Sequence, residues 1–129
     1  MPVYTTWADT ARTCTCTRLT GYWTWEDFRR AHNRGLRMMD ETPADVVHVI
    51  IDFSSSKAIP PNAIFHFTYY GRQLHPKTGQ IIGVGVPQLL MTTARLMDLV
   101  LPDIATNVHI MPTKAEALTF LGLNSQAHS

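Results

Sequence analysis

The segment Val46–Phe53 constrains the fold of this chain more than any other segment. It reads Val-Val-His-Val-Ile-Ile-Asp-Phe and is followed at once by three serines, Ser54–Ser56. A nearly unbroken apolar run of strand length, ending in an acid and a small polar loop, is typical of a parallel strand buried on both faces of a sheet. The two prolines that open residues 60–74 suit the first turn of a helix. A buried strand followed by a helix predicts an α/β fold.

The remaining elements alternate in the same way and predict one domain over residues 1–129, with a core over about 3–121. We expect strands over 3–9, 12–20, 46–53, 80–86 and 107–111, and helices over 25–41, 60–74, 88–101 and 113–121. The two strands at the start predict an N-terminal β-hairpin. The later strands predict a mostly parallel sheet of about five strands, with four helices on both faces. Residues 124–129 are expected to form a flexible tail.

Composition excludes several classes of protein. The 129 residues are 45% hydrophobic and 16% charged, so the chain can bury a core and is not disordered. A net charge of +1 gives no electrostatic case for binding nucleic acid or an anionic membrane. No run approaches the ~18 apolar residues of a membrane span, and the N-terminus has no signal-peptide pattern. We therefore expect a cytoplasmic protein without a membrane span.

Four short motifs carry a resemblance to a known family. In chain order they are Trp23–Asp27, Val49–Asp52 with Ile59-Pro60 after it, Ile81–Gly85 and Thr113–Ala117. Together with the order of the elements, they resemble the SpoIIAA-like (STAS-like, STAS-SEC14-type) domains of small bacterial proteins, over roughly Val3 to Leu121. The resemblance implies the α/β fold and a bacterial cytosolic setting. Relatives include anti-sigma-factor antagonists, which bind a partner and are phosphorylated, and the family has a distant likeness to lipid-carrying SEC14 domains.

The chain departs from the antagonists at the start of the second helix. They carry a phosphorylated serine there in an Asp-Ser-Ser-Gly type turn, whereas residues 58–62 read Ala-Ile-Pro-Pro-Asn. Asp52 with Ser54, Ser55 and Ser56 forms a candidate site at the end of the central strand, where α/β proteins tend to place ligands. The alternative is a solvated loop whose hydroxyls satisfy backbone groups.

The helix expected over 60–74 has aromatic residues on two opposite faces. One face is an ordinary core stripe of Ala63, Phe67, Tyr70 and Leu74. The opposite face carries Phe65, Tyr69 and Arg72. Because aromatic residues and arginine are favoured at interfaces, these three form a candidate interface. The alternative is that a neighbouring loop covers them.

The helix expected over 88–101 is apolar over a wide arc. Leu90, Ala94, Met97 and Leu101 extend its main apolar stripe sideways and form a candidate apolar pocket. Methionine would suit an adaptable pocket wall, although it also fills gaps in ordinary cores. An arc of this breadth is also typical of a helix packed deep in the core or at a homodimer contact.

The sequence indicates no catalytic, cofactor-binding or metal-binding residues. Its six histidines lack metal-ligand spacing and are expected to be hydrogen-bonded structural residues. Cys14 and Cys16 lie two apart on a strand, too far for a disulfide, and are expected as thiols on one sheet face. No glycine-rich phosphate loop or nucleophile elbow is present.

Three functions remain open in this order. The first is a non-enzymatic protein-interaction or regulatory module that forms a homodimer, or binds another protein, through Phe65, Tyr69 and Arg72. The second is a carrier or sensor of a small apolar ligand or lipid. The third is an enzyme of unknown reaction, which would need Asp52 and a histidine to converge in one cleft.

Overall fold

The computed structural model describes residues 2–123, without the side chains of Thr93, Ala94, Leu96, Met97 and Val100. The strands are β1 (Val3–Trp7), β2 (Cys14–Gly21), β3 (Val47–Ser56), β4 (Thr78–Val84) and β5 (Val108–Met111). The helices are α1 (Trp25–Glu41), α2 (Ala63–Gly71), α3 (Gln88–Val100), α4 (Pro102–Ala105) and α5 (Lys114–Phe120). The predicted single α/β domain is confirmed, and the short helix α4 is an element that the sequence pattern missed. The tail expected over 124–129 lies outside the described residues.

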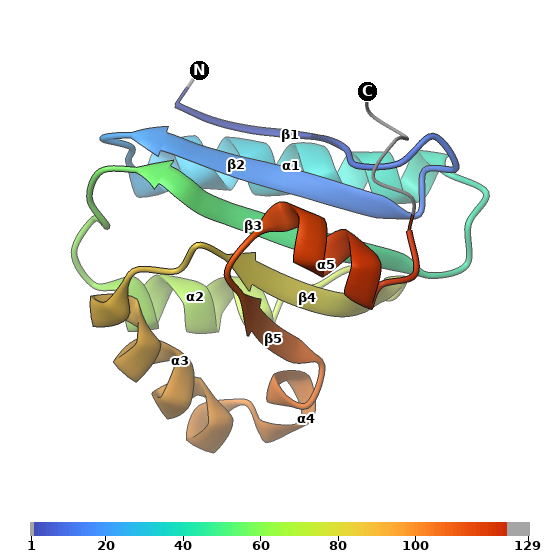
Figure 1. The fold of residues 1–129 in the computed structure, drawn as a ribbon. Helices are drawn as coiled ribbons and strands as arrows, with labels where there is room; N and C mark the ends of the chain where they lie inside the picture. The colour runs from blue at the N-terminus through green and yellow to red at the C-terminus, as the bar shows by residue number, and fades with distance from the viewer. Residues whose placement is uncertain (1, 124–129) are drawn as a thin grey trace.

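The five strands form one mixed sheet in chain order, β1-β2-β3-β4-β5 (Figure 1). β1 and β2 are antiparallel, which confirms the predicted hairpin, and the other three neighbouring pairs are parallel. Crossovers between parallel strands almost always have the same hand, so strands in chain order place their connecting helices on one face. Helices α1 to α4 accordingly lie on one face of the sheet, and α5 lies on the other (Figure 1).

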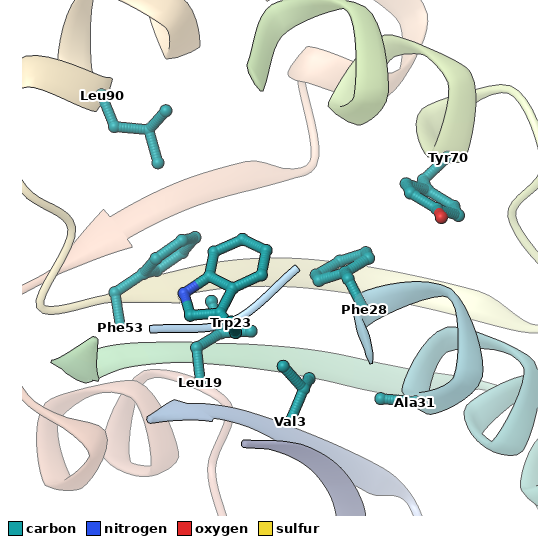
Figure 2. Packing of buried hydrophobic residues seen from close by; sticks show 8 residues of the cluster. All are labelled: Val3, Leu19, Trp23, Phe28, Ala31, Phe53, Tyr70 and Leu90. Carbon is teal, nitrogen blue, oxygen red and sulfur yellow. The ribbon is translucent and has the colours of Figure 1, made fainter. Parts of the chain in front are cut away.

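Alternating side chains along each strand divide the core into two clusters, one on each face of the sheet. The cluster on the α5 face contains Ala8, Cys14, Cys16, Ile50, Ile82, Val84, Ala117 and Leu118. The cluster on the opposite face is rich in aromatic residues and contains Val3, Leu19, Trp23, Phe28, Ala31, Phe53, Tyr70 and Leu90 (Figure 2).

Helix α1 has the bounds that its sequence predicts, because its first turn is closed by local hydrogen bonds. The hydroxyl of Thr24 accepts a hydrogen bond from the backbone N–H of Asp27 at 3.1 Å. The carboxylate of Asp27 accepts one in return from the N–H of Thr24 at 2.9 Å. This capping box satisfies two N–H groups that a helix end leaves free. Further along, Thr5 of β1 donates a hydrogen bond to the carbonyl of Ala31 at 2.9 Å, which fixes the helix to the sheet.

Two local predictions around the central strand are wrong. Ser54–Ser56 belong to β3 rather than to a loop, because β2 continues to Gly21 and pairs with this end of β3. The prolines at 60 and 61 precede α2 instead of opening it. The helix begins at Ala63, after Asn62 adopts a left-handed backbone conformation with φ of 66° that a helix cannot include.

Candidate functional site

A cavity of about 170 Å³ lies between the sheet and its helix-covered face. Its floor is made by residues of β2 to β5, and its walls come from α1, α2 and single residues of α3 and α4. The lining residues are Thr15, Thr17, Phe28, Ala31, His32, Gly35, Leu36, Met39, Val49, Ile51, Phe53, Phe67, Tyr70, Gly71, Leu74, His75, Thr78, Ile81, Gly83, Val86, Leu90, Ile104, Val108, His109 and Ile110. Most of these side chains are apolar.

Short floor residues and paired aromatic walls leave this space open. Thr15 and Gly83 extend little above the sheet, and Gly83 cannot be larger because an added Cβ would lie 2.8 Å from Val86 Cγ2. Above them, the rings of Phe28 from α1 and Tyr70 from α2 contact each other, with centroids 4.9 Å apart (Figure 2). Two helices held together by their own aromatic rings leave room between those rings and the floor.

Most polar groups of the cavity residues already have partners. Thr17 shares a hydrogen bond between hydroxyls with Thr5 at 2.8 Å. His75 Nε2 lies 2.6 Å from a carboxylate oxygen of Asp40. His109 Nε2 lies 2.7 Å from the side-chain oxygen of Gln80. These side chains are less available to a ligand, because their polar atoms already have hydrogen-bond partners.

His32 is the exception among the described residues. Its Nε2 is buried and has no hydrogen-bond partner there. The imidazole lies beside Tyr70 and Phe28, with ring centroids 4.8 Å and 6.5 Å away. Burial lowers the pKa of His32, so its neutral form is favoured. A buried nitrogen without a partner costs about 1–3 kcal/mol, which marks this side chain as one that gains from a ligand.

The expectation that every histidine is hydrogen-bonded is therefore wrong for His32. The sequence offered one signal, which is that His32 shares the apolar face of α1 with Phe28, Ala31 and Met39. Whether Nε2 of His32 has a hydrogen-bond partner depends on which side chains of α2 pack over that face. Sequence periodicity along α1 carries no information on this point.

The predicted pocket residues of α3 contribute less than expected. Leu90 is buried and lines the cavity, as predicted. Leu101 is half-buried and is not among the lining residues. The side chains of Ala94 and Met97 lie outside the described part of the chain. The cavity is lined mainly by α1, α2 and the sheet, which the sequence pattern of α3 could not indicate.

The predicted interface residues come together on the outer face of α2. Phe65 and Tyr69 are 67% and 50% exposed, and Arg72 is also exposed. With Ile64, Thr68 and Gln73 they border a shallow depression. The opposite stripe of the helix packs inward as expected, since Phe67 and Tyr70 lie in the aromatic core. No neighbouring loop buries the two aromatic side chains within the described residues.

The predicted strand-end site is organised by internal hydrogen bonds. The carboxylate of Asp52 accepts a hydrogen bond from the N–H of Ser54 at 2.9 Å. The hydroxyl of Ser55 accepts one from Arg18 at 3.1 Å, and that of Ser56 accepts one from the indole of Trp23 at 2.9 Å. Asp52 is not among the residues that line the cavity. The cavity histidines and Asp52 therefore do not converge there, which was the geometry that the enzyme hypothesis required.

Comparison with protein-family models and with curated proteins finds no match to this chain. In residues 2–123, no helix is both long and apolar enough to cross a membrane. Within the same residues, no three His, Cys, Asp or Glu side chains gather where they could hold a metal ion.

Proposed function

We propose that this protein binds a small apolar molecule in the cavity and acts as its carrier or sensor. The observation that carries the proposal is the cavity itself, about 170 Å³ with apolar walls. An apolar cavity of ~150 Å³ is large enough to stay dry and to bind benzene. Several apolar lining residues, among them Phe67, Ile81 and Val108, remain half-exposed, so the cavity is not sealed from the surface.

The size of the cavity sets the expected affinity. Burying the ~150–200 Å² of one aromatic ring at ~25 cal/mol per Å² provides about 4–5 kcal/mol. This corresponds to a Kd of about 0.2–1 mM. A ligand of this size dissociates during purification, so binding is best tested by titration with an added compound.

The family resemblance supports the same proposal. We propose that the chain belongs to the SpoIIAA-like family and works in a bacterial cytosol, and the hairpin followed by parallel strands in chain order is compatible with this. The distant likeness of that family to lipid-carrying SEC14 domains fits an apolar cargo. A non-enzymatic role is part of the proposal.

A thermal unfolding experiment with toluene tests the proposed binding. At ten times Kd, a ligand that binds only the folded state adds about 1.4 kcal/mol, which raises Tm by roughly 3–6 °C in a domain of this size. The variant Val49→Phe places a ring in the cavity and should abolish this rise. Val46→Phe adds the same ring to the same strand region at a site that is 51% exposed, and should keep it.

The result that overturns the proposal is a Tm of the wild-type protein that toluene leaves unchanged. An equal rise in wild type and Val49→Phe would also contradict it, because the compound would then bind somewhere else.

The exposed face of α2 favours a second candidate function, which is self-association. Phe65 and Tyr69 are large aromatic residues in contact with solvent, and Arg72 lies beside them. Such a patch is typical of a protein interface. Light scattering should give the mass of a dimer for the wild type and of a folded monomer for Phe65→Ser/Tyr69→Ser. A mass that the double substitution leaves unchanged contradicts the homodimer.

A further inference from the structure

Two rings that carry polar atoms lie side by side in the mostly apolar wall of the cavity. His32 and Tyr70 lie next to each other, where α1 faces α2, and both carry a polar atom on their rings. Leu90 of α3 lies away from Tyr70 on the other side of the aromatic core (Figure 2). The residues that line the cavity near it, Phe53 and Val86, are apolar as well. A molecule that fits such a cavity is polar at one end and apolar over the rest.

We propose that the ligand of this cavity carries one uncharged hydroxyl group, which forms a hydrogen bond with Nε2 of His32 beside Tyr70. This inference rests on the proposed function, since it assigns the ligand class of the same cavity. The ligand class is a small apolar alcohol or phenol. Its ring or chain packs against the apolar side chains of the wall, and its oxygen lies between α1 and α2.

A hydroxyl group fits His32 better than other polar groups do. It can donate to Nε2 or accept from it, so it suits either tautomer of the neutral imidazole. A carboxylate needs a positively charged imidazole, and burial lowers the pKa of His32 away from that form. A carbonyl oxygen only accepts and suits one tautomer alone.

Three of the remaining polar side chains of the wall do not compete for the hydroxyl. Thr17, His75 and His109 are already paired with Thr5, Asp40 and Gln80, respectively. Nε2 is buried in the structure. The proposal therefore requires the imidazole to rotate about Cβ–Cγ when the ligand binds. The hydrogen bond then satisfies an atom that otherwise has no partner among the described residues.

Binding of p-cresol and toluene to the wild type and to His32→Phe tests this inference. The two compounds share a methylated ring and differ by one hydroxyl. The measured quantity is the ratio of their two dissociation constants, from titrations followed by NMR. We expect His32→Phe to shift this ratio by about tenfold towards toluene, because a lost hydrogen bond to a buried group is worth about 1.4 kcal/mol.

Matched variants serve as controls. His66 stacks on Trp25 away from the cavity, with centroids 4.3 Å apart, so His66→Phe should leave the ratio unchanged. In the wild type, the imidazole ¹⁵N signals of His32 should shift with p-cresol far more than with toluene, and this readout needs no variant.

The outcomes separate the two proposals. If neither compound binds, the proposed function fails and the ligand class fails with it. If both bind but His32→Phe keeps the wild-type ratio, or the ¹⁵N signals of His32 respond equally to both compounds, only the inference about the hydroxyl is overturned. Should His32→Phe not fold, the ¹⁵N measurement on the wild type decides.

Discussion

Ile50 and Ile51 are neighbours in β3, yet the two faces of the sheet give them different surroundings. Ile50 is fully buried (0% exposed) in the cluster beneath α5. Ile51 lies on the opposite face, where it borders the cavity and remains half-buried. An apolar strand therefore does not imply that both of its faces are filled. Whether a face is filled depends on the shapes of the side chains that the covering helices place against it.

Truncation of these two neighbours gives the largest expected difference between the faces. Ile50→Ala should lower the free energy of unfolding by about 4 kcal/mol, because it opens a new cavity in a filled cluster. Ile51→Ala should cost only about 2 kcal/mol, since part of the side chain already borders empty space. Denaturant unfolding measures both values. Equal losses would show that the cavity face is as closely packed as the α5 face.

Adding one methylene should change the free energy of unfolding in opposite directions on the two faces of the sheet. Val49→Ile extends into the cavity and should stabilise the fold by about 0.8 kcal/mol. Val84→Ile makes the same change on the fully buried α5 face and should destabilise it by about 1 kcal/mol through overpacking. Both substitutions keep a β-branched side chain in a strand. Two changes of the same sign in denaturant unfolding would remove the distinction between the faces.

Acid should weaken the cavity face through His32. Its pKa is lowered by burial, so the unfolded chain takes up a proton near pH 6.5 that the folded chain resists. The stability that His32 contributes is complete well above pH 6.5 and is lost progressively as pH falls below this value. The protein with His32→Phe should show a smaller loss over the same range. An identical pH dependence of unfolding in both proteins would contradict the burial of a neutral imidazole.

The smallest expected effect concerns reactivity on the filled face. Cys14 and Cys16 are buried free thiols, and burial raises the pKa of each. Because the thiolate is the reactive form, both should react with a thiol reagent only as fast as the protein unfolds. Rapid labelling of either cysteine in the native protein would show that the α5 face opens more easily than its packing indicates.

Local signals predicted the parts of the fold that local contacts determine. The bounds of α1 follow from the capping box at Thr24 and Asp27, whose residues are three apart in the sequence. The length of β3 does not follow from such local contacts. Its last residues, Ser55 and Ser56, pair with Thr20 and Gly21, which lie far away in the chain. Contacts between residues close in sequence can be predicted from sequence motifs, whereas pairing between distant strands cannot.

The candidate sites show the same limit. The exposed positions of Phe65 and Tyr69 could be predicted, because helical periodicity places them opposite the core stripe of α2. The cavity could not be predicted, because its floor combines residues from four strands that lie far apart in the sequence. Leu90 is the one predicted pocket residue that lines it among those whose side chains are described. The missing partner of His32 is likewise a property of the assembled helices.

The most direct test of ligand binding on one face of the sheet is a titration of the wild-type protein with toluene. It is followed by the ¹³C methyl signals of β3 and β4. We predict that the methyl signals of Val49, Ile51 and Ile81, which border the cavity, shift strongly as the toluene ring enters. The methyl groups of Ile50, Ile82 and Val84, on the filled face, should stay in place. Shifts that are equal on both faces, or absent from both, would contradict the claim that one face of this sheet holds an apolar ligand.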